Sequence, residues 1–108
     1  MDEPFLSIVI PAYNEARRIE KSLEKIRQYL DSNSFLSELI VVDDGSTDEM
    51  PHRLGDAAAQ WGALRILRNE PNRGKGYSVR RGVLEARGKY VLFTDADFEQ
   101  TIHFFNRC

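Results

Sequence analysis

The amino-acid sequence predicts an α/β domain in which a mostly parallel β-sheet lies between helices on both faces, in three α/β/α layers. The first observation is alternation: short apolar runs rich in β-branched residues alternate with segments whose apolar residues recur every three or four positions. The second is that polar clusters follow three of the apolar runs, at residues 11–15, 43–48 and 95–97. Strands alternating with helices favour right-handed parallel crossovers, and such sheets bind ligands beyond the carboxyl ends of their strands.

The first predicted strand covers residues 6–10, an apolar run that Pro11 closes. Asn14 is a favourable N-cap for the helix that follows. The apolar residues of this helix recur at spacings of four, three and four, at Ile19, Leu23, Ile26 and Leu30. This amphipathic stripe predicts that the helix covers one face of the sheet.

The remaining elements continue the alternation. In chain order they are a strand at residues 39–42, a short helix from Pro51 to near Gly62, a weaker strand at residues 64–67 and a helix from residues 72–76 to near Gly88. The apolar positions of this last helix are Val79, Val83 and Ala86. The apolar run at residues 90–94 predicts a final, buried strand that ends at two carboxylates, Asp95 and Asp97.

Length and composition limit the function. The 108 residues, 42% hydrophobic and 30% charged, indicate one globular domain over residues 1–108. A single cysteine, Cys108, excludes an internal disulfide framework and fits a reducing compartment. No apolar run approaches the roughly 18 residues of a membrane span, and the first residues lack the pattern of a secretory signal. We therefore expect a cytoplasmic protein without a transmembrane segment.

A basic segment at residues 65–89 holds eight of the 15 lysines and arginines. Its one aromatic residue, Tyr77, does not make a series interleaved with the basic residues, and the pI is about 5.7. Both observations argue against nucleic-acid binding and favour a solvated face. Lys75 differs from the other basic residues of this segment, because a cation at the start of a helix is unfavourable in the field of the helix dipole unless an anion also binds there. Gly74 and Gly76 leave room for the backbone to approach such an anion, and Arg73 or Lys75 is predicted to hold it.

Asp95 and Asp97 are the first candidates for metal ligands. Residues two apart on an extended chain point to the same side, so both carboxylates can face one ligand. At a separation of about 5 Å and an effective dielectric near 20, they repel by roughly 3 kcal/mol, which raises one pKa or recruits a cation. Mg²⁺ or Mn²⁺ fits these oxygen ligands, particularly when a diphosphate supplies further oxygens. The alternative is a turn that caps a helix.

Three sequence blocks together carry a family resemblance. They are Ser-Ile-Val-Ile-Pro-Ala-Tyr-Asn-Glu at residues 7–15, Val-Val-Asp-Asp-Gly-Ser-Thr-Asp at residues 41–48 and Asp-Ala-Asp at residues 95–97. The first block lacks the Gly-x-Gly-x-x-Gly that a dinucleotide site requires, so NAD binding is not expected. In this order the blocks resemble the nucleotide-binding half of a family 2 glycosyltransferase with the Rossmann-like GT-A fold. Within the family, residues 72–76 and 79–82 are most similar to dolichyl-phosphate or undecaprenyl-phosphate sugar transferases, notably the glucosyl enzymes.

The resemblance implies that the first block binds the nucleoside of a sugar nucleotide. Pro11, Ala12 and Tyr13 would pack on the base, and Glu15 would meet the base or the ribose. An alternative for Tyr13 is ordinary packing in the protein. An alternative for Glu15 is a favourable carboxylate in the first turn of the helix.

In the second block, the resemblance implies that Asp44 accepts a hydrogen bond from the base, worth about 1.5–3 kcal/mol if shielded from water. Asp43 is assigned to the same substrate site, with bracing of the turn as its alternative. Asp48 is expected to cap the second helix. A different class of function, phosphoryl transfer from an aspartate as in haloacid dehalogenases, matches only superficially, because that motif separates its two aspartates by one residue.

In the third block, the resemblance implies a divalent metal ion, Mg²⁺ or Mn²⁺, bound by Asp97. Asp95 would be a second ligand or bond the ribose, Ala96 would lie beside the substrate, and Glu99 would complete the metal shell. Arg73 or Lys75 would then hold the diphosphate or a phosphate-bearing acceptor.

The implied reaction is an inverting transfer of glucose or mannose from a nucleoside-diphosphate sugar, with UDP-glucose preferred to GDP-mannose. A polyprenyl phosphate is an implied acceptor, which places the enzyme at the cytoplasmic face of a membrane. Such a phosphate needs no general base, because its second pKa of about 6 leaves it nucleophilic at neutral pH. No catalytic base is assigned in this chain.

Members of the family extend well beyond the Asp-x-Asp block, so this domain is expected to be truncated relative to them. A sheet edge and a core face would then be exposed, and they favour self-association into a homo-oligomer. The alternative function is a non-catalytic fragment that binds a nucleotide sugar and lacks the acceptor half.

Overall fold

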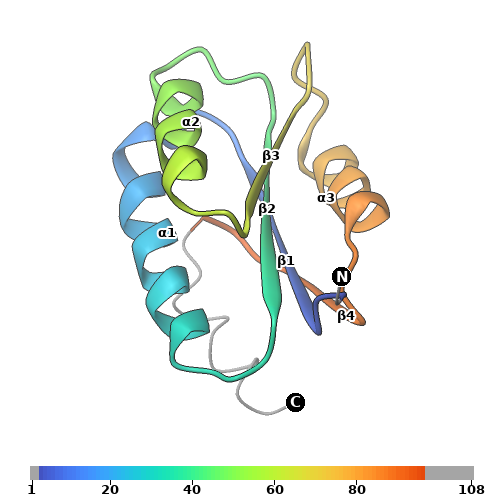
Figure 1. The fold of residues 1–108 in the computed structure, drawn as a ribbon. Helices are drawn as coiled ribbons and strands as arrows, with labels where there is room; N and C mark the ends of the chain where they lie inside the picture. Colours follow the sequence, from blue (N-terminus) through green and yellow to red (C-terminus); the bar gives the residue numbers. More distant parts are fainter. Residues whose placement is uncertain (1–2, 97–108) are drawn as a thin grey trace.

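The computed structural model describes residues 3–96, which form a four-stranded parallel sheet in the order β3-β2-β1-β4. Helices α1 and α2 cover one face of the sheet and α3 covers the other (Figure 1). The elements are β1 Leu6–Ala12, α1 Ala16–Asp31, β2 Ser37–Asp43, α2 Met50–Gln60, β3 Leu64–Arg68, α3 Lys75–Glu85 and β4 Tyr90–Phe93. The predicted three-layer architecture is confirmed. None of the helices in this range has the length and apolar content needed to cross a membrane.

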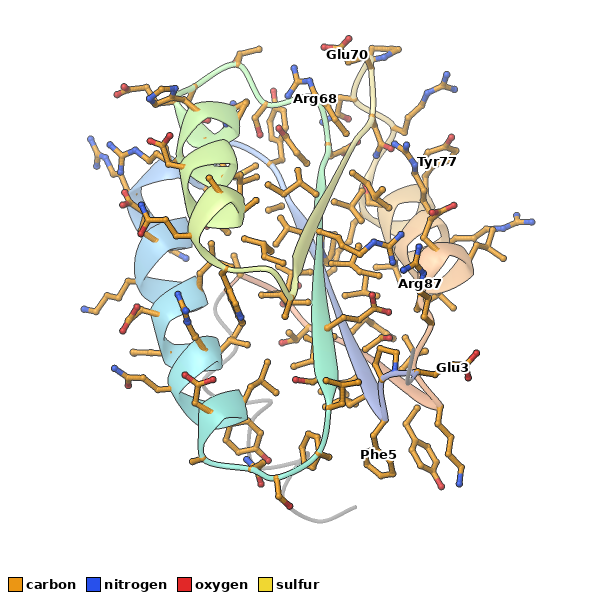
Figure 2. All side chains as sticks on the ribbon, in the orientation of Figure 1. Glu3, Phe5, Arg68, Glu70, Tyr77 and Arg87 are labelled. Carbon is orange, nitrogen blue, oxygen red and sulfur yellow. The ribbon has the colours of Figure 1, made fainter. Side chains whose placement is uncertain are left out.

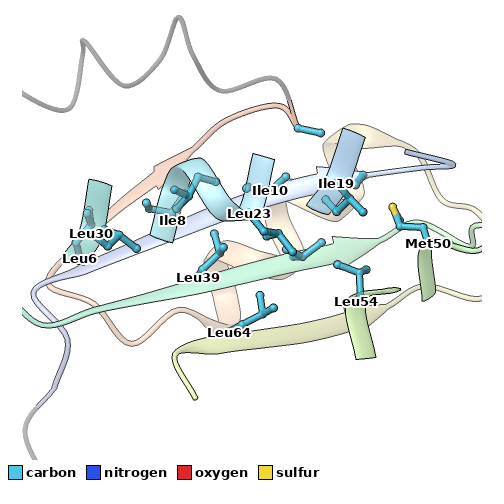
Figure 3. Packing of buried hydrophobic residues seen from close by; sticks show 14 residues of the cluster. Leu6, Ile8, Ile10, Ile19, Leu23, Leu30, Leu39, Met50, Leu54 and Leu64 are labelled. Carbon is cyan, nitrogen blue, oxygen red and sulfur yellow. The ribbon is translucent and has the colours of Figure 1, made fainter. Parts of the chain in front are cut away.

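The larger core lies between the sheet and helices α1 and α2 (Figure 3). The four apolar residues of the predicted α1 stripe are all buried there, and they face alternate residues of β1 and β2 such as Ile10 and Leu39. Met50 and Leu54 contribute the buried positions of α2. Fully burying one such side chain contributes about 1.5–3 kcal/mol, so this layer supplies most of the stabilising apolar contact.

The opposite face of the sheet packs against α3 through small residues. The residues of α3 buried on this face are Ser78 and Gly82, and a Cβ added to Gly82 would lie 2.3 Å from a methyl carbon of Val9. The prediction that Val83 marks the apolar face of this helix is wrong, since its side chain is 41% exposed. The helix lies so close to the sheet that only a small residue fits between them.

Strand β4 corrects the prediction of a buried final strand. Its side chains Tyr90, Val91 and Phe93 are 54%, 41% and 55% exposed. The strand pairs with β1 on one side and lies at the edge of the sheet among the described residues. A run of apolar residues therefore marks the strand but not its burial. An exposed apolar edge of this kind is what the predicted self-association would require, and self-association stays a prediction.

Pro11 does not end the first strand, as the sequence predicted, because β1 continues through Pro11 to Ala12. The carbonyl oxygen of Ala12 accepts from the N–H of Asp44 on the β2 side, whereas that of Val9 accepts from Thr94 on the β4 side. Successive residues of a strand direct their backbone N–H and C=O groups to opposite sides, so the nitrogen of Pro11 faces β4, as the backbone of Val9 does. It lies beyond the last β4 residue that pairs with β1. The missing N–H of proline therefore removes no hydrogen bond from the ladder.

Glu38 is a buried carboxylate that joins α3 to the amino-terminal half of the sheet. It accepts hydrogen bonds from Ser7 Oγ at 2.6 Å, from the N–H of Arg87 at 2.7 Å and from Arg65 Nη1 at 3.0 Å. Burial alone would raise the pKa of this carboxyl, but these three hydrogen bonds and the charge of Arg65 outweigh it and lower the pKa. Arg87, below α3 in Figure 2, follows the end of that helix.

We expect Glu38→Gln to lower the free energy of unfolding by about 2 kcal/mol, because the NH₂ group of the glutamine would face one of the donors that the carboxylate now accepts from. Urea denaturation followed by circular dichroism measures this change. Glu24→Gln is the matched control, since the Glu24 side chain is exposed on α1, and it should change the free energy by less than about 0.5 kcal/mol. Equal effects of the two substitutions would contradict the prediction.

Candidate functional site

A cavity of about 400 Å³ opens beside the carboxyl ends of β1, β2 and β4 and the first turns of α1 and α3. Its lining residues are Pro11, Ala12, Tyr13, Glu15, Arg18, Asp44, Lys75, Ser78, Asp95 and Ala96. Eight of the ten residues predicted to bind substrate are in this set, and Asp43 and Arg73 are not. The three sequence blocks, which are far apart in the chain, therefore meet at one site.

Asn14 holds the first two loops of the site together. Its backbone is in the left-handed region at φ 50°, and its Oδ1 accepts from the N–H groups of Thr47 at 2.8 Å and Asp48 at 3.2 Å. Its own N–H donates to Ser46 Oγ at 2.9 Å. The prediction that Asn14 caps α1 is therefore wrong, because Glu15 stands at the N-cap position and the Asn14 amide instead bonds the neighbouring loop.

Asp48 takes the capping role on two helices. Its Oδ1 accepts from the N–H of Met50, the first residue of α2, at 2.9 Å, so Asp48 bonds the start of this helix as predicted, but from the position before the N-cap residue Glu49. Its Oδ2 accepts from the N–H of Ala16, the first residue of α1, at 3.1 Å. One carboxylate at two helix N-termini satisfies otherwise unpaired donors and meets the positive ends of both dipoles.

We expect Asn14→Ala to lower the free energy of unfolding by about 1–2 kcal/mol, since alanine lacks the amide and disfavours positive φ. Asn14→Gly keeps the backbone conformation at no steric cost, and we expect roughly half of that loss. Urea denaturation gives the free energies, and hydrogen exchange of the Thr47 and Asp48 amides reports the lost acceptor. Unchanged exchange at both amides would show that Asn14 does not hold this loop.

Asp43 is a brace within the protein. Its side chain is 1% exposed, its Oδ1 accepts from the N–H of Ser46 at 2.9 Å and its Oδ2 bonds Arg68 Nη1 at 2.7 Å. Arg68 also bonds Glu70, and Figure 2 shows Arg68 and Glu70 at the end of the sheet opposite Phe5. Both oxygens of Asp43 are thus engaged away from the cavity, in accord with the bracing alternative rather than contact with a substrate.

Asp44 is buried at 5% exposure but still lines the cavity. Its Oδ1 accepts from the N–H of Arg73 at 2.7 Å and from Asn69 Nδ2 at 2.9 Å, and its Oδ2 accepts from the N–H of Gly74 at 2.8 Å. Burial alone would raise the pKa of Asp44, but these three hydrogen bonds outweigh it and lower the pKa. The carboxylate is therefore held ionised, and it fixes the loop that leads into α3.

Lys75 and Asp95 form an ion pair in the wall of the cavity. Lys75 Nζ lies 2.6 Å from Asp95 Oδ1, and the two side chains are 63% and 64% exposed. The neighbouring Arg73 places its guanidinium over the ring of Tyr77, 5.5 Å from the ring centroid, and is not part of the lining. Of the two cations predicted to hold an anion, the structure thus brings only Lys75 into the cavity.

Three further residues belong to the site or support it. Arg18 and Ser78 line the cavity, and Asn69 is 3% exposed and donates from Nδ2 to both Asp44 Oδ1 and Ser78 Oγ. Arg18 lies one helical turn before Ser22, whose hydroxyl donates to the carbonyl oxygen of Ala96. The position of Asn69, just after a strand at the ligand edge of the sheet, is a signal that sequence analysis could have used.

The predicted metal ligands fall partly outside the described residues. Asp95 lines the cavity, whereas Asp97 and Glu99 lie beyond residue 96. Within residues 3–96, no three histidine, cysteine, aspartate or glutamate side chains are grouped so that they could hold a metal ion. The assignment of Asp95, Asp97 and Glu99 as metal ligands therefore stays a prediction.

Sequence comparison identifies the family of this chain. The family described as glycosyl transferase family 2 matches residues 7–107. A dolichyl-phosphate beta-glucosyltransferase of Saccharomyces cerevisiae is 41% identical over 108 residues, which cover 89% of this chain and 30% of the relative. A protein of the same description from Dictyostelium discoideum is 37% identical over 114 residues, which cover 99% of this chain and 35% of the relative. The chain thus spans about a third of the length of these curated relatives.

Solved structures share the fold. The mannosyltransferase PcManGT from Pyrobaculum calidifontis, in complex with GDP-Man and Mn²⁺, matches with a TM-score of 0.76 and 31% identity over 89% of this chain and 28% of that chain. S. aureus TarS 1-349 in complex with UDP-GlcNAc matches with a TM-score of 0.72 and 26% identity over 94% and 31% of the two chains. The predicted GT-A fold and the resemblance to dolichyl-phosphate glucosyltransferases are confirmed. This chain belongs to glycosyl transferase family 2.

Proposed function

We propose that this chain is the donor-binding part of an inverting glycosyltransferase that moves glucose from UDP-glucose to a polyprenyl phosphate at the cytoplasmic face of a membrane. The observation that carries the proposal is the cavity, which combines an open wall at residues 11–13, the buried acceptor Asp44 and the Lys75–Asp95 pair. The dolichyl-phosphate beta-glucosyltransferases among the relatives support glucose as the sugar and a polyprenyl phosphate as the acceptor.

The nucleoside would bind along the end of β1. Tyr13 is 45% exposed, so its ring is available for packing on a base, with Pro11 and Ala12 beside it. Asp44 already accepts hydrogen bonds from Asn69 and from the N–H groups of Arg73 and Gly74, and an ionised carboxylate has about four acceptor positions. An N–H of the base would donate to the remaining acceptor position of Asp44, and Glu15 would accept a hydrogen bond from a ribose hydroxyl.

The charge of the cavity supports a divalent cation. Its lining contains three carboxylates, those of Glu15, Asp44 and Asp95, against two cations, Arg18 and Lys75. A diphosphate adds further negative charge, which these two side chains do not balance. Asp95 fits a metal ligand, because its exposed oxygen already contacts one cation, the Lys75 ammonium. A bound Mg²⁺ or Mn²⁺ would neutralise the charge that develops on the leaving diphosphate.

The transfer itself requires little proton chemistry. An oxygen of the acceptor phosphate would form a bond to the anomeric carbon while the bond from that carbon to the diphosphate breaks on the opposite face, which inverts the configuration. The acceptor is already ionised at neutral pH, so this chain need not supply a general base. Lys75 and Arg18 would neutralise part of the charge that accumulates on the leaving diphosphate, and the wall at residues 11–13 would hold the nucleoside in place.

Calorimetric titration of the purified chain with UDP and with GDP, each with and without Mn²⁺, tests the donor site. We expect UDP to bind in the presence of Mn²⁺ and GDP to bind at least about tenfold more weakly, a difference of about 1.4 kcal/mol. A folded chain that binds neither nucleotide would overturn the proposal. Transfer is measured separately, with labelled UDP-glucose and dolichyl phosphate, and UDP binding without transfer would favour the non-catalytic alternative.

A further inference from the structure

We propose that Lys75 is an exchangeable cation: its ammonium group neutralises Asp95 in the free protein and moves to the diphosphate when a divalent cation binds Asp95. This inference rests on the proposed function and adds the order of contacts within the donor site. The observation behind it is that Lys75 Nζ lies 2.6 Å from Asp95 Oδ1 in the wall of the cavity. An ammonium group at this distance takes a place that a cation on the same oxygen would need.

The backbone beneath Lys75 is fixed while its side chain is free to move. Asp44 accepts from the N–H groups of Arg73 and Gly74, and the N–H of Ser78 donates to the carbonyl oxygen of Gly74 at 3.1 Å. A Cβ added to Gly74 would meet no atom within 4 Å, so the surroundings of the helix start are open. The Lys75 side chain is 63% exposed, and rotamer changes of exposed side chains need no movement of the backbone.

The energetics of the pair suit an exchange. An ion pair between two exposed side chains is weak, so Lys75 leaves Asp95 at little cost. Lys75 and a divalent cation repel each other on the same carboxylate, whereas a diphosphate attracts both of them. A diphosphate that draws Lys75 away therefore favours the cation on Asp95. By linkage, the cation must favour the nucleotide by the same factor.

The test measures two affinities of the purified chain: that of Mn²⁺ alone, by electron paramagnetic resonance, and that of UDP at saturating Mn²⁺, by calorimetry. In Lys75→Gln we expect Mn²⁺ alone to bind about two- to fivefold more tightly, because its competitor is gone. We expect UDP to bind about tenfold more weakly in the same variant, because a charge-assisted contact to the diphosphate is lost. The two affinities should thus change in opposite directions.

Two further variants separate exchange from a general effect of charge. Arg80→Gln removes one charge from an exposed position of the same helix outside the cavity, and we expect neither affinity to change. Lys75→Arg keeps the charge, and Mn²⁺ alone should bind no more tightly than to the unmodified chain. Circular dichroism checks that each variant is folded.

The outcomes distinguish this inference from the proposed function. UDP binding that requires Mn²⁺ in the unmodified chain, with opposite changes in Lys75→Gln, supports both. UDP binding that requires Mn²⁺, with no gain in Mn²⁺ affinity in Lys75→Gln or an equal gain in Arg80→Gln, overturns the exchange and leaves the donor site standing. Absence of nucleotide binding in the unmodified chain overturns the proposed function, and the exchange with it.

Discussion

Replacing Gly82 by valine is expected to lower the free energy of unfolding by about 3 kcal/mol, the upper end of the usual cost of overpacking a core. A Cβ at this position would lie 2.3 Å from Cγ1 of Val9 and 3.3 Å from Cγ2 of Val42. Val9 is fully buried and β-branched, so its methyl groups cannot rotate away without a new clash. The helix must instead move off the sheet.

Gly55→Val is the matched control for this substitution. Gly55 lies within α2, and a Cβ added there would meet no atom within 4 Å. We expect the free energy of unfolding to change by less than about 0.5 kcal/mol, because glycine and valine differ little in helix propensity. Urea denaturation of both variants gives the comparison. If Gly82→Val were no more destabilising than Gly55→Val, the close packing of α3 on the sheet would be wrong.

Gly82 also matters for the site, because α3 carries Lys75 at its first residue. A helix lifted from the sheet would displace the loop that Asp44 holds at Gly74. We therefore expect Gly82→Val to weaken binding of UDP as well as stability, although Gly82 does not line the cavity. The close contact between Gly82 and the sheet thus affects the site because it sets the position of α3.

The sequence predicts most of the fold because strands and helices leave different periodicities. The α1 stripe and the β-branched runs of β1 and β2 are strong signals, and the structure places them as expected. The close approach of α3 to the sheet is not predictable in the same way. The spacing of apolar residues predicts that Val83 faces the core, but in the structure Gly82 does. The small distance between α3 and the sheet requires a glycine there, and no local sequence pattern encodes that distance.

The candidate site shows the same division between local and non-local information. Strand ends are local features, so the meeting of residues 11–15, 43–48 and 95–96 at one cavity could be predicted. The separate roles of Asp43 and Asp44 depend on partners about 25 to 30 positions away, such as Arg68 and Gly74. Arg18 enters the site because of its place on the α1 surface, which becomes clear only when the helix is docked.

Replacing Asp44 by alanine is expected to lower the free energy of unfolding by about 3 kcal/mol, because it leaves the buried amide of Asn69 and the part-buried N–H groups of Arg73 and Gly74 without an acceptor. The same substitution should weaken UDP binding by at least about tenfold, since it would remove the proposed acceptor for the base and loosen the start of α3. Asp56→Ala is the control, because the Asp56 side chain is 70% exposed on α2. Equal stability of the two variants would contradict the role given to Asp44.

The same carboxylate gives a pH dependence whose sign follows from its pKa. Burial alone would raise the pKa of Asp44, but the hydrogen bonds from Arg73, Asn69 and Gly74 outweigh it and lower the pKa from its ordinary value of 3.8. The unfolded chain therefore takes up this proton first as the pH falls. The stabilising contribution is fully present well above pH 3.8 and declines as the pH falls toward the lowered value in the folded state. Urea denaturation at a series of pH values should show a smaller loss of stability below pH 5 in Asp44→Ala than in the unmodified chain, and parallel curves would contradict this assignment.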